Sequence, residues 1–285
     1  MPNLMTEWWQ YFPEHIDPVA FTVGYVSVRW YAICFIFGFF AAVVAVLIRS
    51  RKERTPYGQG TIWDASIAIC IGILLGGRLG FALLYQRTLF LNPLSLISPI
   101  DPRTGVFSGI HGMSFFGALI GSGIALFLFI RSRRLKFMEL SDILVPAVPI
   151  SLFFGRIGNF LNLELPGRKT TVPWGMYLPD PLTGVWELRH PSPLYEALLE
   201  GILLSIAVSL VRRWKPTGGY VTITFLLGYA IVRFLVEFVR EPDPGSLMVF
   251  GWMTIGQTLS LALFIVGGML FCFARKSEKN MEESR

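Results

Sequence analysis

The sequence predicts an all-α polytopic membrane protein with about seven transmembrane helices. Of its 285 residues, 53% are hydrophobic and only 15% are charged, a balance that water-soluble domains of this length do not show. Seven apolar stretches are long enough to cross a hydrocarbon layer of roughly 30 Å as helices. They lie near residues 28–48, 62–85, 113–131, 140–163, 193–211, 219–239 and 253–274.

Lysine and arginine placement predicts the orientation of these helices, because basic loops stay in the cytoplasm. Fifteen basic residues follow the first, third, fifth and seventh stretches, and six lie in the opposite loops: Arg87, Arg103, Arg168, Lys169, Arg189 and Arg240. The N-terminus is therefore expected outside and the C-terminus in the cytoplasm. We expect residues 1–275 to form a single integral membrane domain and residues 276–285 a short charged cytoplasmic tail.

The N-terminal segment and the remaining composition exclude several classes of protein. Residues 1–15 lack a basic region followed by an apolar core, so the first stretch is expected to act as its own signal. The net charge of +6 is explained by basic residues that flank the stretches, and no nucleic-acid partner is expected. No residue cluster has metal-ligand spacing, so neither a metal nor a cofactor is expected. Three cysteines fall inside apolar stretches and are interpreted as packing residues: Cys34, Cys70 and Cys272.

Four arginines remain within the apolar stretches or at their edges: Arg29, Arg78, Arg156 and Arg233. An arginine at membrane depth costs several kcal/mol, and it indicates a function by default. With the predicted orientation, all four lie toward the outer leaflet. We therefore predict an anion-binding site that opens outward; the alternative is that these side chains extend to the lipid headgroups.

Local spacing adds polar groups to this site. Tyr229, Arg233, Glu237 and Arg240 share one face of a helix, so that Arg233 and Glu237 can pair. In the fourth stretch, Arg156 and Asn159 are neighbours at i and i+3.

Other polar residues in the stretches have simpler interpretations. Asp64 and Asp142 are interpreted as helix-start residues. Ser192 is predicted to be an N-cap, with Glu196 complementing the dipole of the helix that follows. Glu200, one turn deeper, is less easily explained in this way.

Glycines and loops complete the predicted architecture. Glycines recur at every fourth residue in two stretches, which favours close helix packing: Gly72, Gly76 and Gly80, and Gly117 and Gly121. Residues 86–112 and 164–192 form long outer loops that contain aromatic side chains. They are expected to cap the site, although a belt of aromatic residues at the membrane interface is an alternative.

Several motifs, taken together, resemble the prolipoprotein diacylglyceryl transferase family. They are GRIGNFLNLELPGR (155–168), RHPSPLYEALLEG (189–201) and GYAIVRFLVEFVREPD (228–243), supported by VRWYAI (28–33), LGGRLGFALLY (75–85) and GMSFFGALIG (112–121). The resemblance extends over nearly the whole chain. It implies seven spans with the N-terminus outside, in agreement with the charge distribution.

The resemblance also implies an activity. The family moves the diacylglyceryl group of phosphatidylglycerol to the thiol of a lipobox cysteine in a secreted prolipoprotein and releases glycerol 1-phosphate. The family motif implies roles for Arg156, Asn159, Glu164 and Gly167. Tyr31, Tyr229, Arg233 and Glu237 match further positions that the family needs, and Arg78 and Arg240 are added as expected substrate-binding residues.

One position departs from the family pattern. Where the family usually has a histidine in M-S-F-H-G-G, this chain has Phe116, and Ala118 replaces the second glycine. That histidine is a proposed proton acceptor, so its absence leaves the base open between the field of the arginines and His111, five residues upstream. A transporter or flippase for an anionic lipid, or a membrane scaffold with buried ion pairs, would also contain buried arginines.

Overall fold

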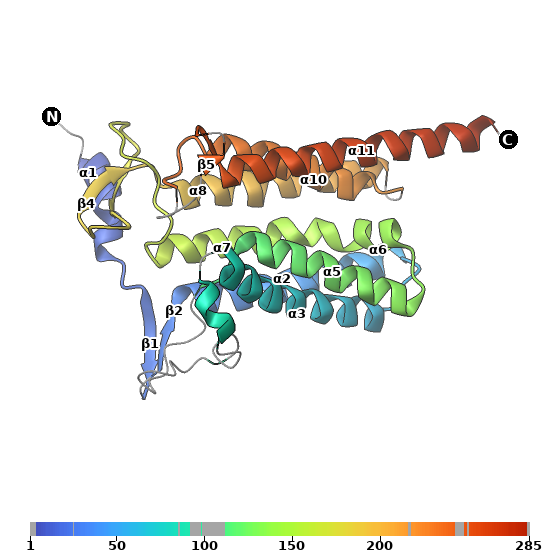
Figure 1. The fold of residues 1–285 in the computed structure, drawn as a ribbon, viewed down its shortest axis with the longest axis horizontal. Helices are drawn as coiled ribbons and strands as arrows, with labels where there is room; N and C mark the ends of the chain where they lie inside the picture. The colour runs from blue at the N-terminus through green and yellow to red at the C-terminus, as the bar shows by residue number, and fades with distance from the viewer. Residues whose placement is uncertain are drawn as a thin grey trace. The chain divides into compact units, whose positions relative to one another are not determined.

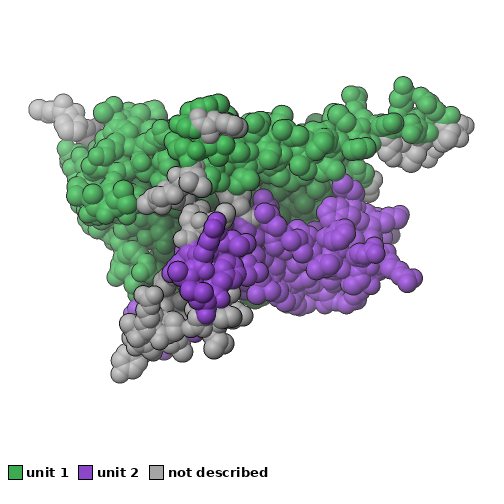
Figure 2. Space-filling model, viewed as in Figure 1, with its two compact units in different colours: residues 1–21, 28–46, 141–285 green, residues 22–27, 47–140 purple. Residues whose placement is uncertain are grey.

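The computed structural model describes residues 4–24, 26–84, 86–91, 98, 112–215, 218–242, 248–249 and 251–283. These residues are mostly helical (Figure 1). They divide into two compact units, which are coloured separately in Figure 2. The first comprises residues 1–21, 28–46 and 141–285, and the second comprises residues 22–27 and 47–140.

The second unit is built around two helices, α3 (Gln59–Leu84) and α5 (Phe115–Arg133). Their backbones touch where the predicted glycines face one another. A Cβ atom on Gly80 would lie 2.6 Å from the Cα atom of Gly117, and one on Gly121 would lie 2.7 Å from the Cα atom of Gly76. The predicted close packing is thus confirmed. Asp64, predicted to start a helix, instead lies inside α3 and pairs with Arg133 across the helix pair at 3.0 Å.

The first unit contains the longer run of helices. It includes most of α2 (Trp30–Glu53). After α6 (Phe137–Leu144) and the turn η3 (Val145–Ala147) comes α7 (Val148–Leu161). A continuous helical segment follows, made of α8 (Ser192–Glu196), the π-helical turn η4 (Ala197–Leu203) and α9 (Leu204–Trp214). Helices α10 (Tyr220–Val236) and α11 (Ile255–Glu283) lie side by side (Figure 1).

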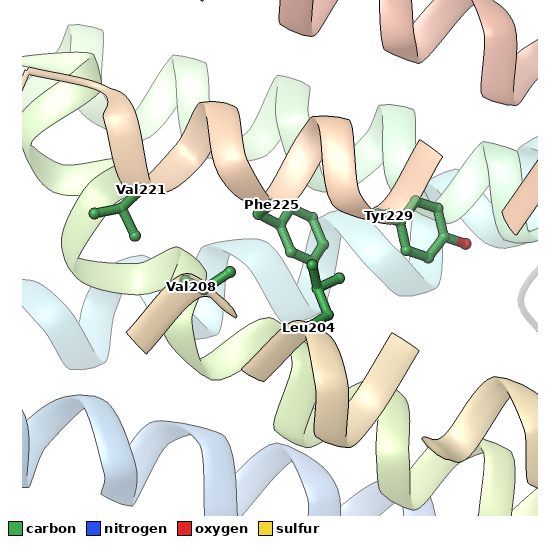
Figure 3. Close-up of a cluster of buried hydrophobic side chains, with 5 residues drawn as sticks. All are labelled: Leu204, Val208, Val221, Phe225 and Tyr229. Atoms are coloured by element: carbon green, nitrogen blue, oxygen red, sulfur yellow. The ribbon is translucent and has the colours of Figure 1, made fainter. Parts of the chain in front are cut away.

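An apolar core joins α9 to α10. Figure 3 shows its side chains, Leu204 and Val208 from α9 facing Val221, Phe225 and Tyr229 from α10. This contact aligns the two helices so that residues on their neighbouring turns reach the same buried region.

Asp142 has a different role from the one predicted. Its carboxylate is fully buried and accepts hydrogen bonds from the backbone N–H groups of Gly219, at 2.7 Å, and Thr222, at 2.9 Å. Gly219 is the N-cap of α10 and has no side chain with which to satisfy these donors. Asp142 therefore caps a helix that is distant in sequence, which sequence spacing could not indicate.

Among the described residues, three short strand pairs interrupt the helical architecture; they were not predicted. They are β1 (Val19–Val23) with β2 (Val26–Arg29), β3 (Met176–Pro179) with β4 (Trp186–Arg189), and β5 (Met248–Val249) with β6 (Met253–Thr254). The antiparallel β3–β4 pair lies in the predicted outer loop 164–192 and begins with Met176 opposite Arg189. The N-terminal helix α1 (Leu4–Tyr11), followed by the turn η1 (Phe12–His15), packs on it: the rings of Tyr11 and Tyr177 stack with centroids 4.5 Å apart.

Helical segments occupy all seven predicted stretches. Within the described residues, five helices are long and apolar enough, by length and composition, to cross a membrane: Trp30–Glu53, Gln59–Leu83, Phe137–Leu161, Ser192–Trp214 and Ile255–Asn280. Tyr220–Val236 is a shorter apolar helix. Cys272 on α11 is exposed, so its interpretation as a packing residue within the protein is wrong.

Candidate functional site

The carboxylate of Glu196 lies between three arginines in the first unit. Its Oε2 atom is 3.0 Å from Nη1 of Arg156, and its Oε1 atom is 3.3 Å from Nη1 of Arg233 and 3.1 Å from Nη1 of Arg240. All four side chains are buried. Glu196 was predicted only to complement a helix dipole; its contacts show instead that it is the central anion of this arginine cluster.

Two further glutamates complete the cluster. Glu200 accepts from Nη2 of Arg156 at 2.9 Å and from Nε at 3.0 Å, both through its single oxygen Oε2, along one edge of the guanidinium. Glu237 pairs with Nη1 of Arg233 at 2.7 Å, as the sequence predicted, and accepts a hydrogen bond from Thr254 at 2.9 Å. The buried cluster thus contains three cationic and three anionic side chains.

The local backbone explains why these groups meet. Glu196 ends α8 and Glu200 lies in the π-helical segment η4, where both side chains are fully buried. π-Helical turns are rare and frequently occur at functional sites. Gly201 allows α7 to approach this segment, because a Cβ atom there would lie 2.6 Å from the Cβ atom of Phe153. Arg156, on the following turn of α7, thereby reaches both glutamates.

The balance of charge in the cluster has an energetic reason. Removing an ion from water costs several kcal/mol, which only close ion pairs and hydrogen bonds offset. With equal numbers of guanidiniums and carboxylates, each buried charge has a partner of opposite sign. Removing one member leaves a buried unpaired charge, which costs about 3–5 kcal/mol. The cluster is therefore rigid and sensitive to single substitutions.

The end of α7 is organised around Glu164. One carboxylate oxygen accepts from the amide of Asn159 at 3.3 Å, and the other accepts from the amide of Asn162 at 3.1 Å. The side-chain oxygen of Asn162 in turn accepts from the backbone N–H of Tyr31 at 3.3 Å. Asn159, Glu164 and Tyr31, which were predicted site residues, are thus connected. Asn162 was missed, although its position in the same polar motif could have indicated it.

Gly167 occupies a position that no larger residue could take. A Cβ atom there would lie 2.6 Å from the Cβ atom of His190 and 2.7 Å from the carbonyl oxygen of Val239. Its N–H donates to the carbonyl of His190 at 2.8 Å. It also forms an isolated antiparallel bridge with Arg240, which links the motif following α7 to the arginine cluster.

Three other predicted residues, Arg29, Arg78 and Tyr229, have different surroundings. Arg29 ends strand β2 and is exposed, whereas Arg156 and Arg233 are buried. Arg78 belongs to the second unit, where it donates to the carbonyl of Gly112 at 3.2 Å. Tyr229 packs in the core, with its ring stacked on Phe225.

His111 and most of the predicted cap at 86–112 lie outside the described residues, and so does the side chain of Phe116. The second predicted cap, residues 164–192, is described throughout and carries β3 and β4.

Comparison with known proteins places the chain in a family. Residues 18–273 match the family model described as prolipoprotein diacylglyceryl transferase. A phosphatidylglycerol–prolipoprotein diacylglyceryl transferase of Chlorobaculum tepidum is 39% identical over 97% of this chain and 96% of its own length. Proteins of the same name from Coxiella burnetii (41% identical, 94% of this chain and 99% of their own) and Nitratidesulfovibrio vulgaris (42%, 90% and 93%) are similarly close. This chain belongs to the prolipoprotein diacylglyceryl transferase family.

Proposed function

We propose that this protein transfers the diacylglyceryl group of phosphatidylglycerol to the thiol of the lipobox cysteine of a prolipoprotein, the first step of lipoprotein maturation. The observation that carries the proposal is the cluster in which Arg156, Arg233 and Arg240 converge on Glu196. Guanidiniums hold phosphate oxygens in a planar, bidentate geometry. In a family member, a buried group of three such side chains suits an anionic lipid headgroup.

The reaction is a displacement at carbon. The thiolate sulfur of the substrate attacks the carbon of the diacylglyceryl group that is bonded to the phosphate oxygen. A carbon–sulfur bond forms as that carbon–oxygen bond breaks. The departing oxygen takes the electron pair, so glycerol 1-phosphate leaves with additional negative charge. Arginines fixed before the reaction stabilise that charge most strongly where water is excluded. The nucleophile comes from the prolipoprotein, and the enzyme needs no catalytic cysteine of its own.

Arg233 is the arginine best placed to bind the phosphate. Within the described residues it contacts both Glu196 and Glu237 through Nη1. Its Nη2 and Nε groups therefore remain for phosphate oxygens while the ion pairs hold the guanidinium in place. Arg156 holds Glu196 and Glu200, and we assign it a share in phosphate binding together with Arg240. Tyr229 lines the core beside these helices and is proposed to shape the site.

The polar motif after α7 supplies the remaining proposed contacts. Glu164 holds the amides of Asn159 and Asn162 in fixed orientations. Tyr31 is half-exposed at the start of α2, beside this group. We assign these side chains, with Gly167, to the glycerol headgroup and the ester linkages. Arg78 is kept as a substrate-binding residue.

The thiol is proposed to ionise in the field of the arginines. A free thiol has a pKa near 8.5, so a few per cent is thiolate at pH 7, and nearby cations lower that pKa. His111 is assigned an auxiliary role. On this proposal, His111→Gln lowers the transfer rate less than Arg156→Lys does, and the rate rises with pH toward the thiol pKa. Loss of all turnover in folded His111→Gln protein that still binds phosphatidylglycerol would instead make His111 the base.

We further propose the arrangement of the protein in the bacterial inner membrane. Seven helices cross the bilayer, with the N-terminus outside and the C-terminus in the cytoplasm, as the distribution of basic residues favours. Residues 1–275 act as one integral membrane domain and residues 276–285 as a cytoplasmic tail. The active site faces the outer leaflet beneath the loop 164–192, where a secreted prolipoprotein and phosphatidylglycerol can both reach it.

One assay separates this function from lipid transport. Purified protein is incubated with phosphatidylglycerol vesicles and a synthetic lipobox peptide, and the thioether product and glycerol 1-phosphate are measured. Equal amounts of both products are expected. A variant with Cys34, Cys70 and Cys272 replaced by alanine or serine should retain transfer, because the nucleophile belongs to the peptide. Movement of lipid between leaflets without any thioether product would favour the transporter or flippase.

A further inference from the structure

Arg189 is a fully buried cation that the proposed chemistry does not use. It ends strand β4 and is only 1% exposed. Its Nη2 group pairs with Asp180 and, at 3.0 Å, with Glu187, both on the β3–β4 hairpin. Its Nη1 group lies 3.2 Å from the carboxylate of Glu241 and 3.1 Å from the carbonyl oxygen of Gly167, both outside the hairpin. One guanidinium therefore joins three separate chain segments.

The two contacts of Nη1 flank the backbone that presents Arg240. Gly167 and Arg240 are paired across an antiparallel bridge, and Glu241 is the residue after Arg240. The ladder extends by the hydrogen bonds from Arg168 N–H to the Val239 carbonyl, at 2.8 Å, and from Glu241 N–H to the Pro166 carbonyl, at 3.3 Å. Arg189 thus holds both strands of this ladder at the point where the Arg240 side chain leaves it to meet Glu196.

We infer that Arg189 is a positioning residue for the transfer reaction, which fixes the backbone of Gly167 and Glu241 so that the Arg240 guanidinium reaches the phosphate. The inference rests on the proposed function, in which Arg240 binds the lipid phosphate. Arg189 itself contacts none of the reacting groups. Its effect on the reaction is transmitted through Arg240.

The chemistry of arginine explains why lysine could not replace Arg189. The guanidinium presents two terminal nitrogens in one plane, and here each contacts two acceptors. An ammonium is a single compact point of charge and cannot place donors at both ends of this arrangement. Arg189→Lys keeps the charge beside the three carboxylates and loses the geometry. It is therefore a suitable probe of positioning.

A double-mutant cycle tests the inference, because positioning through Arg240 requires that the two residues do not act independently. The variants are Arg189→Lys, Arg240→Lys and both together, each assayed for kcat and KM with phosphatidylglycerol and a lipobox peptide. Arg240→Lys is expected to lower kcat/KM by about a hundredfold. Arg189→Lys is expected to lower it by about tenfold, since a small misplacement of a binding group is costly. The double variant should match Arg240→Lys alone, rather than fall about a thousandfold.

A matched control and a milder variant accompany the cycle. Lys169→Gln removes the exposed partner of Glu187, at 2.7 Å on the same hairpin, and should leave kcat/KM unchanged because exposed ion pairs contribute little. If Arg189→Lys does not accumulate as folded protein, Glu241→Gln replaces it in the cycle. This variant removes a half-exposed partner of Arg189 and is expected to show the same non-additivity with a smaller loss.

The outcomes distinguish the inference from the function on which it rests. A double variant whose loss is the product of the two single losses, or an Arg189→Lys protein at full rate, would overturn the inference and leave the role of Arg240 intact. Full activity in Arg240→Lys would remove Arg240 from phosphate binding and overturn both. Matching losses in Arg240→Lys and the double variant support the inference.

Discussion

Gly256→Ala is predicted to damage the arginine cluster without removing any charge from it. Gly256 lies in the first turn of α11, where its backbone faces the carboxylate of Glu237. A Cβ atom at this position would lie 2.5 Å from Oε1, 2.7 Å from the carboxyl carbon and 2.9 Å from Oε2 of Glu237. Real Cβ atoms essentially never approach so closely, so the carboxylate has to move.

The expected magnitude follows from the contacts that the carboxylate would lose. Glu237 accepts a hydrogen bond from Thr254 at 2.9 Å and pairs with Arg233 at 2.7 Å. A hydrogen bond to a charged group is worth about 1.5–3 kcal/mol. A displacement that breaks one of them and loosens Arg233 should therefore lower kcat/KM by about ten- to a hundredfold.

The assay is transfer of diacylglycerol to a lipobox peptide, measured with thermal unfolding in the same detergent. Gly268→Ala is the matched control, because it lies on the same helix and no atom lies within 4 Å of its Cβ position. It should keep full activity and gain a few tenths of a kcal/mol to 1 kcal/mol of stability, since alanine favours the helix over glycine.

The reasoning is refuted if Gly256→Ala transfers lipid at the rate of the unaltered protein while folding normally. That result would mean that Glu237 need not hold Arg233 in the geometry described. Equal losses in Gly256→Ala and Gly268→Ala would assign the effect to the helix as a whole and not to the Glu237 contact.

Three other predictions follow from the same structure. Arg156→Lys should lose most activity although the charge is kept, because a compact ammonium cannot present two adjacent donors to Glu200 and a third to Glu196; near-normal kcat at matched protein levels would contradict its proposed role. Gly117→Ala should destabilise the protein by about 1–3 kcal/mol, because its Cβ atom would meet the backbone of α3, whereas Gly123→Ala, with open space around it, should unfold like the unaltered protein. Asp180 and Glu187 have pKa values below their ordinary 3.8 and 4.5, owing chiefly to backbone N–H donors at Asp180 and to Lys169 at Glu187. The two carboxylates therefore stabilise the fold above those ordinary pKa values, and this stabilisation is lost as the pH falls below them. Replacing both residues with their amides should reduce the loss of thermal stability in acid. An unchanged acid transition would contradict this.

The helical architecture could be predicted because the length of an apolar stretch and the spacing of its glycines are local features of the sequence. Apolar stretches of about twenty residues must form helices in a bilayer, where backbone groups find no water. The glycines at 72, 76, 80, 117 and 121 are spaced for one helix face, and the structure places them in contact. The pairing of Arg233 with Glu237 was also local, at i and i+4. These features depend on neighbours within a few turns of the same segment or on a simple repeat.

The small strands escaped prediction because their segments are short and irregular. The pair β3–β4 is held together by Arg189 and its carboxylate partners as well as by its ladder. Two of those partners lie on the hairpin itself, but the third, Glu241, comes from a distant segment that only the folded chain brings within reach. Asp142 is a similar case, since it caps a helix whose N-cap residue, Gly219, lies 77 residues later.

The identity of the central anion was decided by tertiary structure alone. The arginines lie in residues 155–168 and 228–243. Because burying a guanidinium is costly, their presence in apolar stretches predicted an anion site from composition and spacing. In sequence, Glu196 is indistinguishable from a residue that complements a helix dipole. It contacts Arg156, Arg233 and Arg240 because α7 and α10 both pack on α8, and because the Gly167–Arg240 bridge fixes the chain that follows α10. A buried charge selects its partner by distance in the folded protein, and distances between segments far apart in sequence arise only from packing.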